Sequence, residues 1–181
     1  MEQTDKKIEI QEKSQDISYK DIFQVINRAH EENRKNGLKI NTKIKDEGQL
    51  EEHLKGSTIF VALVDGALAG TVSVRLERGD RKFTNDLNTA YLMHLAVLPE
   101  YKGYHLGTLL CEAVEKNGRE NGAHAIALYV VDKNPAKAFY KHIGFEPLDF
   151  IPRTGLKQNS VYMVKWLNEP TASAMYRRCY F

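Results

Sequence analysis

The sequence is poor in cysteine, proline and tryptophan. Its 181 residues include 2 cysteines, 5 prolines and 1 tryptophan. Two cysteines without motif spacing do not make a disulfide framework, and they fit a reducing compartment. The 6 histidines form no cluster with them at metal-ligand spacing, so we expect no metal site.

Long apolar runs and a strong excess of one charge are also missing. The longest apolar stretches have the length of strands, far below the roughly 18 residues of a membrane-spanning helix. No apolar segment follows the charged start, so no signal peptide is expected. The net charge of +2 gives no signature of nucleic-acid binding. We therefore expect a cytoplasmic protein that does not bind nucleic acid.

What remains is the composition of one ordinary globular domain. Hydrophobic residues make up 42% and charged residues 28%, and the chain is long enough for one sizeable core. We expect a single domain over residues 1–167 and a C-terminal tail over residues 168–181. The tail mixes aromatics with arginines, but a packed or disordered terminus is favoured over membrane contact. The oligomeric state stays open, and a homodimer is allowed.

Apolar residues recur at helical spacing in some segments and alternate or run continuously in others. The predicted strands cover about residues 8–10, 58–64, 67–76, 91–97, 125–131 and 161–166. The predicted helices cover about residues 18–37, 46–55, 106–121 and 134–142. Residues 77–90 are charged and lack periodicity, and we expect an exposed loop there. This order predicts a mixed α/β sheet with a parallel crossover at residues 91–131.

The stretch from Leu95 to Gly107 is the first that suggests chemistry. A buried strand ends, a turn containing Gly103 follows, and an amphipathic helix begins. The N–H groups at a helix start have no intrahelical partner, and with the helix dipole they favour phosphates. Lys102 adds a charge nearby. The pattern is neither a P-loop nor a dinucleotide fingerprint, and by itself it also fits an ordinary strand-to-helix turn.

A second block, Asn134 to Phe145, follows the next predicted strand, and the two blocks together resemble the GNAT N-acetyltransferase superfamily. The family's pyrophosphate loop, Arg/Gln-x-x-Gly-x-Gly/Ala, corresponds to residues 102–107. Every specified position of its second signature, Asn-x-x-Ala-x-x-Phe-Tyr-x-x-x-Gly-Phe, matches in the second block. Two positions of the loop depart from the pattern. Lys102 cannot bind phosphate bidentately as Arg does, and His105 stands where glycine is usual, where it either hinders one backbone amide or donates to a phosphate.

The resemblance implies a fold and an activity. The fold is α/β, with a mixed, mostly antiparallel central sheet of about six to seven strands flanked by about four helices. The activity is that of an N-acetyltransferase, which moves an acetyl group from acetyl-CoA to a primary amine of an unidentified acceptor by direct attack. His105 and the lack of an evident base motivate the alternative, a catalytically inactive acyl-CoA-binding sensor or scaffold with the same fold.

The resemblance also implies roles for residues of both blocks. The main chain of Leu95 and Val97 would pair with the pantetheine arm, and an N–H near Leu95 would polarise the thioester carbonyl. Tyr140 would donate a proton to the departing thiolate, and Asn134 would hydrogen-bond the cofactor arm. The implied cofactor-binding residues are Leu95, Ala96, Val97, Lys102, Gly103, Tyr104, His105, Leu106, Gly107, Thr108, Asn134, Ala136 and Tyr140.

The general base stays open at this point. Relatives often carry it two or four residues before the equivalent of Leu95, but Met93 and Tyr91 are not bases. His94 has the wrong side-chain parity unless a β-bulge shifts it, and a core histidine is the commoner reading. Two glutamates of the first predicted helix, or a chain of water molecules leading to solvent, would also serve as the base. Those glutamates are Glu31 and Glu32.

The acceptor wall is expected from residues 30–56 and from the 77–90 loop. Residues 30–55 carry equal numbers of acidic and basic side chains, which favours neither a strongly cationic nor a strongly anionic acceptor. Cys111 lies on the predicted helix next to the phosphate loop, where we expect it to be buried, so we expect no covalent intermediate on this thiol.

Overall fold

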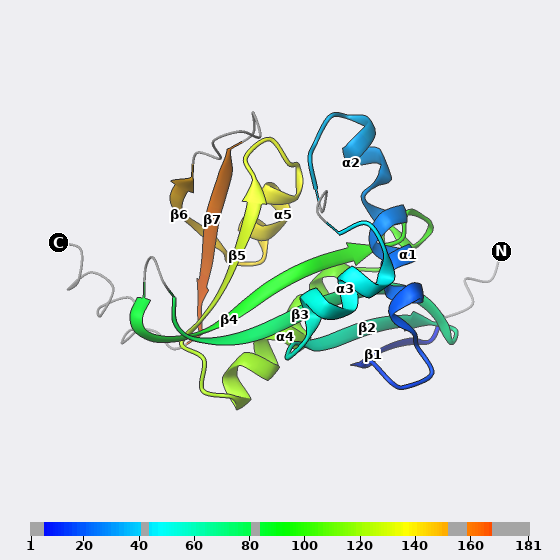
Figure 1. Cartoon of the computed structure of the whole chain (residues 1–181), viewed down its shortest axis with the longest axis horizontal. Helices are drawn as coiled ribbons and strands as arrows, with labels where there is room; N and C mark the ends of the chain where they lie inside the picture. Colours follow the sequence, from blue (N-terminus) through cyan, green and yellow to red (C-terminus); the bar gives the residue numbers. More distant parts are fainter. Residues whose placement is uncertain (1–5, 41–43, 81–83, 152–158, 168–181) are drawn as a thin grey trace.

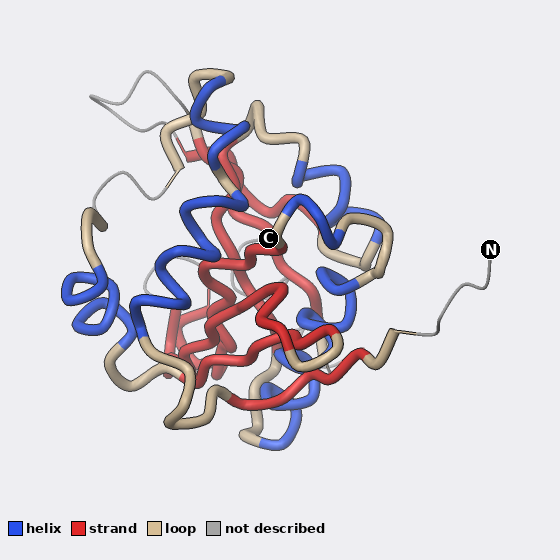
Figure 2. Tube along the Cα trace, turned by 90° about the vertical axis from the view of Figure 1, so that its right-hand side faces the viewer, coloured by secondary structure: helices blue, strands red, loops and turns tan. Residues whose placement is uncertain are grey.

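A twisted sheet with helices on both sides makes up the computed structural model, which describes residues 6–40, 44–80, 84–151 and 159–167 (Figures 1 and 2). The expected tail, residues 168–181, lies outside this range. The strands are β1 (Ile8–Glu12), β2 (Thr58–Val64), β3 (Ala67–Asp80), β4 (Thr84–Val97), β5 (Ala125–Val131), β6 (Glu146–Ile151) and β7 (Ser160–Trp166). The helices are α1 (Tyr19–Ala29), α2 (Glu31–Lys35), α3 (Glu47–Leu54), the 3₁₀-helix η1 (Pro99–Tyr101), α4 (Leu106–Glu120) and α5 (Ala136–His142).

The seven strands lie in the order β1-β2-β3-β4-β5-β7-β6. Every neighbouring pair is antiparallel except β4 and β5, which are parallel and are joined by the crossover through α4. The prediction of a mixed, mostly antiparallel α/β sheet is confirmed. No helix in the described ranges is both long enough and apolar enough to span a membrane.

The apolar residues form separate cores on the two faces of the sheet. On one face, α1 and α3 pack through Ile22, Ile26 and Leu50 against β2 and the end of β4. On the other, α4 packs through Leu110 and Val114 against β2 to β5, with α5 at its side. The alternation of side chains along each strand distributes them between these two cores.

Local sequence signals explain several element boundaries. Ser18 caps α1, accepting a hydrogen bond from the Asp21 N–H, while the Asp21 carboxylate accepts one from the Ser18 N–H. Asp65 and Gly66, with φ of 51° and 80°, form the tight turn between β2 and β3. Positive φ at both turn positions is what a type I′ hairpin requires, and Asp-Gly tolerates it.

The predicted order of elements was wrong in three places. Residues 77–90 were expected as a loop, but residues 77–80 belong to β3 and residues 84–90 to β4, and Glu77 pairs with Thr89 and Arg78 with Asn88. Polar pairs of this kind carry no apolar alternation, so the pattern missed them. The predicted helix over residues 18–37 is broken at His30, because its second part, α2, has no buried side chain to hold it in line. Strand β6 was not predicted.

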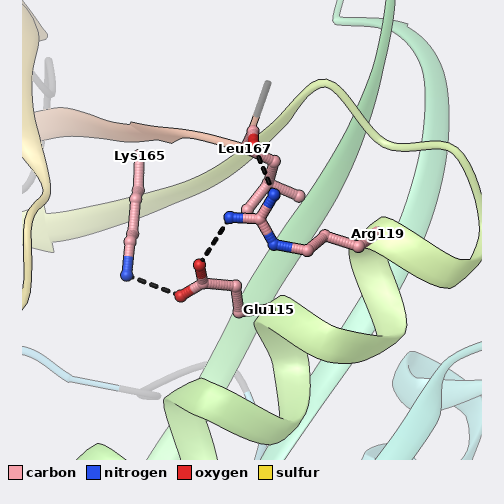
Figure 3. A network of polar contacts seen from close by, with 4 residues as sticks. All are labelled: Glu115, Arg119, Lys165 and Leu167. Carbon is pink, nitrogen blue, oxygen red and sulfur yellow. Dashed lines mark hydrogen bonds and ion pairs between the residues drawn. The ribbon is translucent and has the colours of Figure 1, made fainter. Parts of the chain in front are cut away.

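The sheet is nearly divided between β4 and β5. These strands pair at only three positions, Thr89, Ala90 and Tyr91 with residues 125–127, and then diverge toward the end that carries α2 and α5 (Figure 1). A polar network supports the junction at the other end (Figure 3). There Glu115 of α4 accepts hydrogen bonds from Lys165 of β7 at 2.5 Å and from Arg119 at 2.9 Å, and Arg119 also donates to the Leu167 carbonyl.

Candidate active site

A cavity of about 240 Å³ lies where β4 and β5 have diverged. It is lined from α1 to β7 by His30, Asn33, Lys39, Ile40, His94, Leu95, Tyr129, Val130, Val131, Asn134, Ala136, Phe139, Tyr140 and Ser160. On the side that faces the cavity, no strand of the described chain pairs with residues 92–97 of β4. Leu95 lines the cavity, and Val97 lies two residues further along the same edge of β4. The Leu95 backbone is hydrogen-bonded to His30, and the rest of this edge offers main-chain groups that a bound molecule can use.

A β-bulge in β4 determines which side chains reach this site. Ala96 pairs with Thr71 but Met93 pairs with Ser73, so two residues of β4 stand opposite one of β3. His94 sits in the bulge with φ of 53°. Leu92, before His94, and Leu95, after it, both pack on the α4 side. In a regular strand, residues three positions apart point to opposite faces, so the alternation of side chains shifts by one residue at the bulge. The bulge supplies the shift that the sequence alone left conditional for His94.

The side chain of His94 is therefore on the face covered by α1 and α3. Its ring lies edge-on to that of His53 in α3, with centroids 5.2 Å apart. Both of its nitrogens are buried without a hydrogen-bond partner in the described chain, an arrangement that costs about 1–3 kcal/mol per group. Burial, with smaller contributions from His53, His30 and Arg75, lowers the pKa of His94 to about 4.

His30 is a site residue that the sequence did not reveal. It lies between α1 and α2, lines the cavity, and has a buried Nδ1 without a partner among the described residues. Burial lowers its pKa to about 4, helped by the Arg34 charge and opposed by a hydrogen bond with the Leu95 backbone. The break between α1 and α2 places the His30 side chain in the cavity wall. The sequence predicted one continuous helix through this position, and so gave no sign of that placement. Glu31 and Glu32 instead lie exposed on α2 and pair with Lys35 and Lys102.

Tyr140 and Cys111 are two weak acids whose pKa values bear on the expected chemistry. Tyr140 is buried, lines the cavity and packs between Phe139 and Phe145. Burial, with the nearby Cys111, raises the pKa of its phenol well above the ordinary value, so it is a proton donor and not a base at neutral pH. Burial also raises the pKa of the Cys111 thiol to about 12, which leaves it unreactive as a nucleophile.

The loop before α4 presents main-chain donors beside the cavity's β4 wall. His105 is the N-cap of α4 and adopts φ of 56°, the conformation that glycine favours, and it makes no side-chain capping bond. In the described chain, the N–H groups of Gly103, His105, Leu106 and Gly107 have no acceptor, whereas those of Thr108 and Leu109 bond to the His105 carbonyl. Donors of this kind at the start of a 15-residue helix suit an anion.

The remaining predicted binding residues differ in what they can offer. The Lys102 ammonium lies 3.6 Å from Glu32, with both side chains exposed, so its charge is shared with that carboxylate. The Asn134 Oδ1 accepts a hydrogen bond from the Ala136 N–H, which leaves the Asn134 amide to donate and Ala136 to serve as wall. Tyr104 packs against Tyr101, with Lys6 5.2 Å above its ring. Among the described residues, no group of three His, Cys, Asp or Glu side chains could hold a metal.

The sequence also matches known proteins, and the match includes both blocks that surround the cavity. The model of the acetyltransferase (GNAT) family matches residues 19–145, which is more than half of the chain. The chain belongs to the GNAT family. The matched range includes β4, the loop before α4 and the block that begins at Asn134.

Two curated relatives are acetyltransferases of α-amino groups by name. The chain is 32% identical over 103 residues to an N-alpha-acetyltransferase of Saccharolobus solfataricus, covering 52% of this chain and 61% of that one. It is 33% identical over 86 residues to the [ribosomal protein bS18]-alanine N-acetyltransferase of Haemophilus influenzae, covering 45% and 59%. The aligned region thus spans about three fifths of the length of these curated relatives.

Solved GNAT structures share the fold. The structure of yncA, a putative acetyltransferase from Salmonella typhimurium with acetyl-CoA, has a TM-score of 0.67 at 18% identity and covers 90% of this chain and 95% of its own. A GNAT-family acetyltransferase from Staphylococcus aureus Mu50 has a TM-score of 0.66 at 20% identity, covering 90% and 100%. At these identities the likeness concerns the fold alone.

Proposed function

We propose that this protein is an N-acetyltransferase that uses acetyl-CoA to acetylate a primary amine by direct attack. The observation that carries the proposal is the cavity between β4 and β5, which Leu95 and Tyr140 line at an edge of β4 that no strand of the described chain covers. Acetyl-CoA, when bound, supplies an activated acetyl group as a thioester. The buried Cys111 supports direct attack, because its raised pKa disfavours a thiolate.

The residues around the cavity fit such a donor molecule in chemical type. Residues 103–107 would hold the diphosphate with main-chain N–H groups, and Leu95 to Val97 would align the amide-bearing arm as a neighbouring strand would. The Asn134 side-chain amide would hydrogen-bond the same arm. Lys102 would contribute a weaker, solvent-screened charge, because it is exposed and shared with Glu32.

Tyr140 would protonate the departing thiolate. In water a phenol with pKa near 10 gives its proton to a thiolate of pKa near 8.5 at a cost of about 2 kcal/mol. Burial raises the pKa of Tyr140 further, so full transfer requires that the same dry surroundings also raise the basicity of the thiolate. A hydrogen bond from the phenol that strengthens as negative charge develops meets the same need without full transfer.

The acceptor that the cavity suits best is an α-amino group of a peptide. None of the described lining residues is a carboxylate, so nothing there attracts a multiply charged amine or holds a proton strongly. An α-amine, with pKa near 7.8, is easier to deprotonate at neutral pH than a lysine amine near 10.4, by about 3.5 kcal/mol. The names of the two curated relatives, both acting on α-amino groups, support the same class.

The test combines acetyl-CoA binding by calorimetry with thiol release over a panel of peptides and small amines. We expect binding by the wild type and turnover with a free peptide N-terminus. Tyr140→Phe should lower kcat by about 100-fold or more with the Kd for acetyl-CoA within about threefold, as expected for a general acid. Tyr19→Phe, the same loss of a phenol hydroxyl on α1 at a residue that does not line the cavity, is the matched control and should keep most of kcat.

Two outcomes would contradict parts of this proposal. Unchanged turnover in Tyr140→Phe would remove the phenol from the mechanism and leave the activity. Binding of acetyl-CoA without acetylation of any amine in the panel would favour the alternative, a sensor or scaffold that binds acyl-CoA and does not catalyse transfer.

A further inference from the structure

Two imidazole rings connect the cavity wall to the protein surface. His94, in the bulge of β4, lines the cavity, and His53 is exposed on α3. Their ring centroids are 5.2 Å apart and their planes are nearly perpendicular, at 84°. At this separation a ring rotation or one water molecule brings a nitrogen of one ring within hydrogen-bond reach of the other.

His94 is held in this position at an energetic cost that packing alone does not explain. Its backbone is in the left-handed region, with φ of 53°, and both ring nitrogens are buried without a partner in the described chain. Strained backbone and unsatisfied polar groups are concentrated at functional sites. An apolar side chain of similar size would fill the same space without leaving two nitrogens unsatisfied.

We propose that His94 and His53 form the route by which the acceptor amine loses its proton to solvent. The inference rests on the proposed function. The N–H bond of the acceptor ammonium breaks, its electron pair stays on the amine nitrogen, and the proton bonds to a nitrogen of His94. His94 then passes a proton to His53, which releases it to water on the α3 side, so both rings return to their neutral state.

The charges around the pair suit transport of a proton and not its storage. The titratable and charged groups that face His94 are His53 from α3, His30 from the junction of α1 and α2, and Arg75 from β3. Arg34 adds a charge behind His30, and Arg75 also bonds to the His53 carbonyl and to Ser57. All are cationic or neutral, so a proton on His94 is repelled and leaves. The described cavity wall has no carboxylate that would retain it.

The decisive kinetic measurement is the pH dependence of kcat/KM with a peptide α-amine. If the enzyme deprotonates the ammonium form, kcat/KM of the wild type should vary less than about threefold between pH 6 and pH 7.5. In His94→Asn, kcat/KM should fall about 100-fold at pH 6 and rise about tenfold per pH unit toward the amine's pKa. This variant would react only with the neutral amine, whose fraction increases with pH in the same way. Asparagine is chosen because it tolerates the positive φ of this position.

His53→Gln is the second variant, since an exposed residue of α3 can be replaced without disturbing the core. It should lower kcat about tenfold, and added imidazole should restore most of the loss by carrying the proton instead. His142→Gln, the same substitution at an exposed histidine of α5, should change neither kcat nor its pH profile. Acetyl-CoA affinity should stay within about threefold in all three variants.

A readout without turnover is the NMR titration of the imidazoles in the free protein. His53→Gln removes an imidazole whose protonated form repels a proton on His94, so the pKa of His94 should rise, while burial keeps it below the ordinary value. A pKa of His94 that is unchanged in His53→Gln, or a His94→Asn enzyme with wild-type kcat/KM at pH 6, would overturn the route while acetylation by the wild type continued. If the wild type itself acetylated no amine, the proposed function would fail first, and the route with it.

Discussion

His105 departs from the family motif at a strained backbone position. The family pattern has glycine there, and the histidine adopts a left-handed backbone, with φ of 56°, the conformation that glycine favours. A β-carbon in that conformation costs roughly 1–2 kcal/mol. The surrounding contacts hold the chain in place: the His105 carbonyl accepts hydrogen bonds from Thr108 and Leu109 at 3.0 and 3.1 Å. The cost falls on stability, and the main-chain donors remain presented.

We therefore expect His105→Gly to stabilise the protein by about 1 kcal/mol, seen as a rise in Tm of about 2–4 °C. His105→Ala is the control, because it keeps the β-carbon and with it the strain. If the side chain serves only as backbone, acetyl-CoA affinity by calorimetry should be the same in both variants. A fall in affinity of about tenfold in both would show instead that the imidazole donates to a phosphate. A lower Tm for His105→Gly would contradict the strain argument.

At this scale the sequence placed residues that belong to motifs, and it could not place residues that tertiary packing brings to the cavity. Leu95, Asn134 and Tyr140 belong to motifs with fixed spacing, and all three line the cavity. His30 belongs to no motif, since a helix break and tertiary packing bring it to the wall. His94 depended on a bulge, and whether a strand contains a bulge is decided by its partner strands and not by local alternation.

The elements were predicted best where their apolar residues are buried. Helix α4 has a clear apolar stripe, strand β5 is an almost continuous apolar run buried on both faces, and both lie within one or two residues of the expected bounds. The outer part of the β3–β4 hairpin and the whole of β6 were missed. The hairpin pairs polar segments, which leave no periodic trace in the sequence, and β6 is a short strand that begins with Glu146 and Pro147.

The contact between α4 and β7 is an element-scale feature whose strength can be measured. Partial burial works to raise the pKa of Glu115, but hydrogen bonds and charge from Lys165 and Arg119 outweigh it, and the net pKa is lowered. Both Glu115 and Lys165 are less than one third exposed, so solvent screens this pair less than a surface pair.

Lys165→Met should therefore lower the free energy of unfolding by about 1–2 kcal/mol in urea denaturation, because Glu115 keeps only Arg119. Lys116→Met is the matched control. It removes an exposed ion pair with Glu120 within α4, and it should change stability by less than about 0.5 kcal/mol. Equal effects of the two substitutions would mean that the network joining α4 to β7 is no stronger than an ordinary surface pair.

For the whole molecule, the two buried histidines of the cavity determine how stability responds to acid. His30 and His94 have pKa values of about 4 in the folded chain, below the ordinary value of 6.5. Above pH 6.5 both imidazoles are neutral in the folded and in the unfolded chain, so protonation of these two groups costs no stability there. As pH falls from 6.5 to 4, the unfolded chain binds protons that the folded chain refuses, and stability declines by on the order of 3 kcal/mol per histidine.

We expect the unfolding free energy in urea to be lower at pH 4.5 than at pH 7. His94→Asn should make that decline shallower, since one of the two groups no longer titrates. His142→Gln, at an exposed position, should leave the slope as in the wild type. A decline of equal steepness in His94→Asn and the wild type would show that His94 titrates normally in the folded protein.

The three residue pairs that join β4 to β5 have a mechanical consequence. The antiparallel ladders on either side are longer, with nine paired positions between β3 and β4 and seven between β5 and β7. Tension applied between the outer edges of the sheet would concentrate on the short parallel ladder and on the Glu115 network beside it. Under such a load β4 and β5 would separate first, leaving two parts of the sheet that each retain antiparallel strands. A compound bound to both strands would oppose this separation.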